Sequence, residues 1–146
     1  MRKDEKRRRK IKSLGFTLIE MTVVIAIIGL LATLGASAAL HQLKKAKQET
    51  ARSTIQLLDQ AILSFQIDTG RLPKSLDELL KNPGDKKWTG PYLNKLEEIP
   101  KDPWKTDYIY IVPGTHGDFD IISYGEDKLQ GGDGFNADIG NWIEKD

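Results

Sequence analysis

Apolar residues dominate the chain from Met21 to Leu40, a run of 20 residues that contains no charged side chain. As an α-helix that rises about 1.5 Å per residue, such a run spans the roughly 30 Å hydrocarbon core of a bilayer. Glu20 stands at the start of the run, and an ionised carboxylate at that depth costs about 2.5–3.5 kcal/mol on insertion scales. The pattern therefore predicts a transmembrane helix whose glutamate needs a compensating partner.

Beyond Leu40 the pattern becomes amphipathic, with apolar residues recurring at spacings of mostly three and four. The stripe comprises Leu40, Leu43, Ala46, Lys47, Ala51, Ile55, Leu58, Ile62 and Phe65. Neither proline nor glycine interrupts the chain from Ala36 to Asp68. Gly70, as the residue after the C-terminal cap, and Pro73 then predict the end of the helix. One helix of about 50 residues is expected, half of it in lipid and half in a folded domain.

The rest of the chain predicts a short helix and a β-hairpin. "SLDE", Ser75 to Glu78, has the spacing of a capping box, with serine as N-cap and glutamate three residues later. Two β-type runs, Tyr108–Val112 and Phe119–Tyr124, are joined by six residues, so we expect an antiparallel hairpin that packs on the upper half of the long helix. The predicted fold class is α+β.

Charge is distributed unevenly along the chain. Eight basic residues precede Phe16, whereas the remaining chain holds 14 of the 22 basic residues and 19 of the 21 acidic ones. A basic segment that abuts an apolar run is retained on the cytoplasmic side, which predicts a cytoplasmic N-terminus and a C-terminal domain on the far side. Basic tails also bind nucleic acid, but the position next to the apolar run favours the anchor, and no nucleic-acid partner is expected.

Two simpler interpretations of the N-terminus remain open at this point. The chain is a plain single-pass anchor, or it carries a secretory signal peptide that is cut near "ASAA", Ala36 to Ala39. Against the signal peptide, the apolar run exceeds the usual 7–15 residues and the amphipathic pattern continues past the supposed cut.

An oxygen-rich loop is predicted between Tyr124 and Asp138. Carboxylate and amide side chains recur there among glycines that permit tight turns: Glu126, Asp127, Asp133, Asn136 and Asp138. Hard oxygen donors on a flexible loop suit calcium, although the EF-hand spacing is absent. By spacing alone, a solvated Asp/Gly turn remains the alternative.

Catalytic chemistry has little support in the sequence. The chain has no cysteine, and its two histidines, His41 and His116, are far apart in the sequence. This arrangement disfavours a thiolate nucleophile, a histidine-based triad and a zinc site. We do not expect an enzyme.

The segment "KSLGFTLIEMTVVIAIIGLLA" resembles the class III signal of type IV pilins and pseudopilins. This resemblance implies that a prepilin peptidase cuts between Gly15 and Phe16 and leaves an N-methylated phenylalanine. It further implies that Glu20 of one subunit pairs with the Phe16 amine of its neighbour in the membrane. Pairing lowers the cost of the buried charge.

The C-terminal region is similar to the major pseudopilins of type II secretion, the general secretion pathway protein G family. The matching pieces are "GPYL", "IPKDPW", "PGTHGDFDI" and "NADIGNW". The resemblance implies a calcium loop with ligands from the following residues, the first two through carboxylates and the next two through nearby carbonyls. They are Asp127, Asp138, Tyr124 and Gly132, with Asp133 and Asn136 as further candidates.

The resemblance implies a structural subunit that polymerises into the periplasmic pseudopilus of a type II secretion system. Its segments are a leader (1–15), a transmembrane and assembly helix (16–40), an amphipathic continuation (41–70) and a globular domain (71–146). The implied partners are other copies in a helical homopolymer, minor pseudopilins, the inner-membrane assembly platform, prepilin peptidase and membrane lipid. The protein would cross the bacterial inner membrane once, with its C-terminal domain in the periplasm. A subunit of a related type IV or DNA-uptake pilus, and a monomeric membrane-anchored calcium-binding module, remain alternatives.

Overall fold

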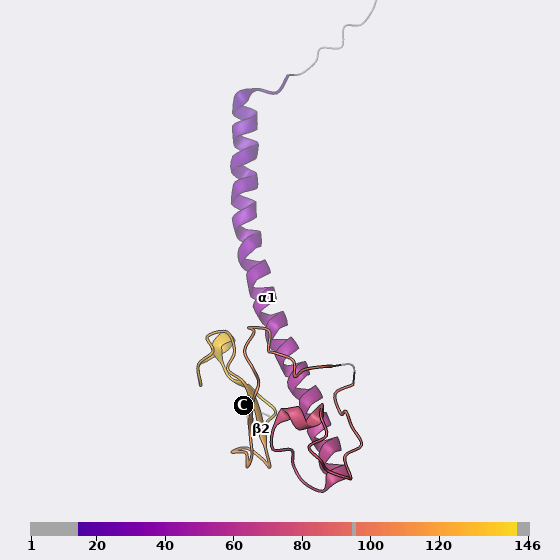
Figure 1. The fold of residues 1–146 in the computed structure, drawn as a ribbon. Helices are drawn as coiled ribbons and strands as arrows, with labels where there is room; N and C mark the ends of the chain where they lie inside the picture. The colour runs from indigo at the N-terminus through magenta and orange to yellow at the C-terminus, as the bar shows by residue number, and fades with distance from the viewer. Residues whose placement is uncertain (1–14, 95, 143–146) are drawn as a thin grey trace, which may run out of the picture. The chain divides into compact units, whose positions relative to one another are not determined.

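The computed structural model describes residues 15–94 and 96–142, apart from the side chains of residues 34–37. Figure 1 shows one long helix followed by short elements of the second half of the chain. In chain order these are α1 (Leu18–Thr69), η1 (Leu76–Leu79), β1 (Ile109–Ile111), β2 (Asp120–Ser123), η2 (Gly134–Asn136) and β3 (Ile139–Gly140), where η marks a 3-10 helix. The chain divides after Ala39 into two units, and α1 contributes to both of them.

In the first unit, every side chain described from residue 15 to residue 33 is exposed. These exposed side chains include large aliphatic ones such as Leu18, at 87% exposure, and Ile25, at 69%. The helix is long and apolar enough to cross a membrane. The prediction of an apolar helix in this region is therefore confirmed.

In the second unit, α1 supplies one side of the hydrophobic core. The stripe residues from Ala51 to Phe65 are all buried, as their spacing predicts. The stripe is not buried along its whole predicted length, however, because Leu40 and Leu43 are 60% and 55% exposed. Periodicity shows which face of a helix is apolar, but it does not show how far the rest of the chain reaches along that face.

The end of α1 is as predicted. Gly70 has a φ of 76°, in the left-handed region that favours glycine, and its N–H donates to the carbonyl of Gln66 at 2.8 Å. This bond satisfies one of the last carbonyls of the helix and turns the chain away from the helix axis.

The predicted capping box at Ser75 is wrong. Ser75 is the N-cap of η1, a single turn of 3-10 helix, but its side chain makes no capping hydrogen bond. The Glu78 carboxylate instead accepts a hydrogen bond from Arg71 Nη1 at 2.8 Å. Both partners of this bond are charged, whereas a backbone amide would offer the carboxylate only a neutral donor, so the bond to arginine is the stronger one and Glu78 does not cap η1.

The three strands form one antiparallel sheet in the order β1-β2-β3, in the last part of the chain (Figure 1). The hairpin is confirmed, with Tyr110 opposite Ile121. β3 was not predicted, because two residues are too short to show a pattern. Side chains from the hairpin complete the core with those of α1, and Ile121 is fully buried.

Candidate cation loop and assembly segment

The predicted cation loop connects β2 to β3, so both of its ends are held by the sheet. Two of its glycines are required by close backbone contacts as well as by their positive φ. A Cβ on Gly125 would lie 2.9 Å from the carbonyl oxygen of Ala137, and one on Gly132 would lie 2.6 Å from that of Asn136. The loop is therefore folded tightly back on itself, and the two glycines allow this close approach.

Asp138 closes the loop and has an incomplete set of partners. Its Oδ2 accepts a hydrogen bond from the N–H of Gly131 at 2.9 Å. Its Oδ1 is buried, and no hydrogen-bond partner for it is found among the described residues. An unpaired buried carboxylate oxygen is costly, and a bound cation would remove that cost.

The other predicted ligands have looser surroundings. Asp127 is exposed, and its Oδ1 accepts a hydrogen bond from the N–H of Leu129 at 3.1 Å. Asp133 precedes η2 without a side-chain cap, and Asn136 is exposed at the end of η2. Within the described part of the chain, no three His, Asp or Glu side chains lie close enough to hold a metal ion. Any cation here would depend on two carboxylates with carbonyl oxygens, a donor set that suits calcium.

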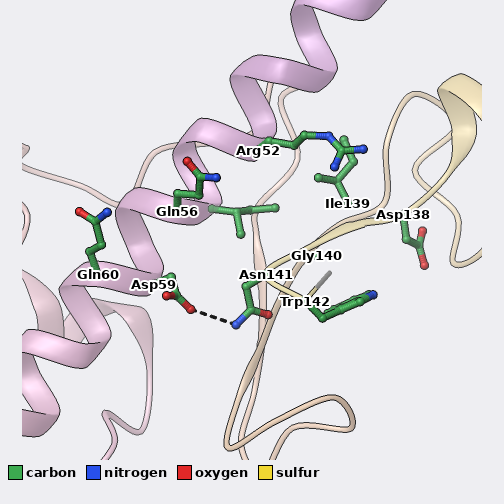
Figure 2. Close-up of a pocket in the computed structure, with 10 residues that line it drawn as sticks. Arg52, Gln56, Asp59, Gln60, Asp138, Ile139, Gly140, Asn141 and Trp142 are labelled. Carbon is green, nitrogen blue, oxygen red and sulfur yellow. Dashed lines mark hydrogen bonds between the residues drawn. The ribbon is translucent and has the colours of Figure 1, made fainter. Parts of the chain in front are cut away.

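A hydrogen-bonding residue that sequence reasoning missed, Asn141, lies just after β3. Its Oδ1 accepts from the N–H of Ile121 at 3.0 Å, and its Nδ2 donates to Asp59 of α1 at 3.1 Å. Figure 2 shows this second bond at a surface pocket of about 440 Å³ between α1 and β3. Asn141 thus links β2 to α1 through its side-chain amide. In the sequence, its place in the "NADIGNW" motif was the only sign that it had a role.

Two buried carboxylates organise neighbouring loops. Asp102 accepts hydrogen bonds from the N–H of Thr106 at 2.7 Å and from Ser123 Oγ at 2.7 Å. Asp120 accepts bonds from the N–H of Thr115 at 2.7 Å and from His116 Nδ1 at 3.0 Å. Burial alone would raise the pKa of Asp120, but the hydrogen bonds from Thr115 and His116 and the nearby imidazole lower it below its usual value.

In the first unit, Glu20 belongs to a capping box that sequence reasoning missed. Its Oε2 accepts hydrogen bonds from the N–H of Thr17 at 2.8 Å and from Thr17 Oγ1 at 2.9 Å. Thr17 Oγ1 in turn accepts a bond from the N–H of Glu20 at 3.2 Å. The Glu20 carboxylate therefore caps the N-terminus of α1. The sequence signature of this cap is "TLIE", in which Thr is followed three residues later by Glu.

The predicted processing residues lie just before this cap. Phe16 is 78% exposed, and a Cβ added to Gly15 would meet no described atom within 4 Å. Both residues are therefore exposed within the described part of the chain.

Comparison with known proteins identifies the family. Residues 38–142 match the family described as type II secretion system (T2SS), protein G, and residues 11–36 match the prokaryotic N-terminal methylation motif. The type II secretion system core protein G of Xanthomonas campestris is 41% identical over 126 residues, covering 86% of this chain and 87% of that protein. The protein of the same name from Pseudomonas aeruginosa is 40% identical over 136 residues, covering 88% and 94%.

A solved structure agrees with these matches. The crystal structure of the major pseudopilin from the type 2 secretion system of enterohaemorrhagic Escherichia coli has a TM-score of 0.56 and 27% sequence identity, and the match covers 70% of this chain and 92% of that one. The resemblance that the motifs indicated is confirmed. The chain belongs to the type II secretion system protein G family.

Proposed function

We propose that this protein is the structural subunit of a type II secretion pseudopilus and polymerises through the first part of α1. The observation that carries the proposal is the exposure of every described side chain from residue 15 to residue 33, a segment whose polar residues are only Thr17, Glu20, Thr22 and Thr33. A helix that is apolar all round is stable only in lipid or among other helices. A pseudopilus subunit meets both environments, lipid before assembly and the helices of neighbouring subunits in the fibre.

Glu20 is proposed to join neighbouring subunits by pairing with the Phe16 amine that processing creates. Both hydrogen bonds from Thr17 go to Oε2, which leaves Oε1 free among the described residues. The cap and the intermolecular pair are therefore compatible in the same side chain. A fixed, hydrogen-bonded carboxylate also loses less freedom when its partner arrives.

Two substitutions at Glu20 and one at Thr17 test this role. Glu20→Gln keeps an oxygen for the cap but removes the charge, so it should abolish fibre formation as fully as Glu20→Ala. Thr17→Ala weakens the cap and leaves the carboxylate, so fibres should still form. Fibre yield in cells is the measurement, with subunit level in the membrane as control. A normal fibre yield from Glu20→Gln would show that Glu20 caps α1 but does not pair with the amine of a neighbouring subunit.

Processing and topology complete the proposal. Cleavage between Gly15 and Phe16 by a prepilin peptidase would precede assembly, with the N-terminus in the cytoplasm and the second unit in the periplasm. The proposed partners are other copies of the chain, minor pseudopilins and the inner-membrane assembly platform. N-terminal sequencing of the mature protein should begin at Phe16. A start at Met1 would indicate an uncleaved anchor, and a start at Ala39 a secreted domain.

We also propose that the loop from Tyr124 to Asp138 holds a calcium ion. Asp127 and Asp138 would bind through carboxylates and Tyr124 and Gly132 through carbonyls, with Asp133 and Asn136 as further candidates. The buried Oδ1 of Asp138, which has no hydrogen-bond partner in residues 15–94 and 96–142, supports this, as does the all-oxygen donor set. When bound, the ion would neutralise the loop's carboxylates and order its backbone.

Melting curves of the full chain in detergent test the calcium site. A hundredfold excess of calcium over its Kd should add about 2.7 kcal/mol of stability, so EDTA should lower the melting temperature by several degrees or more. Asp127→Ala should melt like the chelated protein and ignore EDTA. Asp107→Ala removes the same charge from a side chain that is 84% exposed, and it should keep the response. If the melting temperature of the wild type is the same with calcium, magnesium and EDTA, the loop is a solvated Asp/Gly turn and not a calcium site.

A further inference from the structure

We infer that three residues on one face of α1, His41, Lys44 and Gln48, are positioning residues that set the affinity of the proposed cation loop. They lie in the stretch that directly follows the predicted membrane span. The inference rests on the proposed calcium site, and it assigns a function to a part of the helix that the hydrophobic core leaves uncovered.

The loop contacts this face of α1 at three places. Glu126 pairs with Lys44, with 3.0 Å between Oε2 and Nζ. The ring of Phe135 meets the ring of His41 edge-on, with centroids 5.1 Å apart, and Lys44 Nζ lies 5.6 Å from the same phenyl centroid. Gln48 Nε2 donates a hydrogen bond to the carbonyl of Gly134 at 2.8 Å.

The three helix residues are spaced for a joint role. Positions 41, 44 and 48 are separated by three and four residues, so they lie on one face of α1. The buried core begins only at Ala51, and Leu40 and Leu43 are more than half exposed. Among the described residues, the side-chain hydrogen bonds, ion pairs and ring contacts from this stretch to more distant parts of the second unit all go to the loop.

The contacting residues alternate along the loop with the proposed ligands. Glu126 precedes Asp127, and Gly134 and Phe135 stand between Asp133 and Asn136. Gly134 and Phe135 also belong to η2, whose last residue is Asn136. The backbone arrangement that presents the ligands to an ion is thus the one that meets the helix.

Linkage then couples the two events. If the same ordered loop binds the ion and contacts α1, each event lowers the cost of ordering for the other. The coupling is reciprocal, so contacts that favour calcium binding are strengthened by calcium to the same degree. The positive charge of Lys44 by itself repels a cation bound in the loop. Its favourable effect on calcium binding must therefore come from ordering the loop, and it must exceed this repulsion.

Calcium titration of the full chain in detergent micelles tests the inference. Lys44→Ala/Gln48→Ala should raise the calcium Kd about fivefold or more, a typical size for coupling between sites. The matched control is Gln42→Ala/Lys45→Ala, which removes the same two residue types from exposed positions of the same helix. The control should bind like the wild type, and Lys44→Arg, which keeps the charge and the contact with Phe135, should also.

Two further measurements separate positioning from general stability. The melting temperature in EDTA should be equal in the two double variants, whereas a merely structural role would lower it for Lys44→Ala/Gln48→Ala. Calcium should slow hydrogen exchange of the amides from residue 41 to residue 50 in the wild type and not in that variant.

The outcomes distinguish this inference from the calcium site on which it rests. Equal Kd values for the two double variants, with tight binding by the wild type, overturn the coupling and leave the calcium site intact. No calcium binding by the wild type overturns both.

Discussion

The two parts of α1 differ in where their apolar side chains go. Leu18 and Leu31 in the first unit are 87% and 61% exposed, whereas Leu58 and Ile62 in the second unit are fully buried. The first part is apolar on all sides and the second on one stripe only, although both are regular helix. The second part thus forms a core within the chain, whereas the exposed apolar side chains of the first part are those that we propose to meet lipid and neighbouring subunits.

The stretch between these parts follows neither rule. Its leucines are exposed, and its described contacts are polar or aromatic and go to the loop before β3. The order of this stretch therefore depends on its contacts with the loop, and the order of the loop is proposed to depend on calcium. We expect this stretch to be the part of α1 whose order responds most to calcium concentration.

The largest expected effect separates the two apolar environments directly. Phe65→Ala should lower the free energy of unfolding of the second unit by about 3–5 kcal/mol, because this ring is fully buried and leaves a cavity. Leu31→Ala should change it by less than about 0.5 kcal/mol. Urea unfolding in detergent, followed by tryptophan fluorescence, measures this, since all three tryptophans lie between residues 88 and 142. Equal losses would mean that the two parts of α1 share one core.

A smaller effect concerns the charge buried in the second unit. Because the pKa of Asp120 is lower in the folded than in the unfolded chain, the unfolded state binds more protons as acid is added. The stabilisation is therefore complete above the unfolded pKa of about 3.9 and is lost as the pH falls through the folded pKa.

Asp120→Asn tests this at two pH values. At pH 7 it should cost about 1–3 kcal/mol by weakening charged hydrogen bonds, and the cost should shrink in acid. Asp118→Asn, at an exposed position two residues away, is the control. A cost for Asp120→Asn that is independent of pH would show that its charge is not what the surrounding donors stabilise.

The smallest effect compares two sequences of the same pattern. "TLIE" at Thr17 forms a capping box, whereas "SLDE" at Ser75 does not. Ser75→Ala should therefore change the free energy of unfolding by less than about 0.5 kcal/mol, against about 1 kcal/mol for a working N-cap. Glu78→Gln should cost more than Ser75→Ala, because it removes the negative charge that pairs with Arg71. A full capping loss from Ser75→Ala would indicate that the serine caps η1 in solution.

These two motifs show why sequence reasoning succeeded unevenly. Local patterns predicted the long helix, its end at Gly70 and the β-hairpin, because each depends on residues close together in the chain. The pattern at Ser75 failed because Arg71 offers Glu78 a stronger partner. The role of Asn141 escaped prediction because its partners, Ile121 and Asp59, are distant in the sequence and are brought to it by the fold. Asp120 has nearby partners, Thr115 and His116, but no motif in the sequence marked the turn in which they meet.

The sequence by itself determined the apolar run, the amphipathic stripe and the motifs that identify the family, because periodicity and residue type act over one or two turns of chain. Only the tertiary structure decided that the stripe is buried from Ala51 onward, that a two-residue strand completes the sheet, and that Phe135 meets His41 and Lys44. The contacts of Phe135 with His41 and Lys44 join residues more than 90 positions apart. They form only when the whole unit packs, so a pattern of neighbouring residues in the sequence does not predict them.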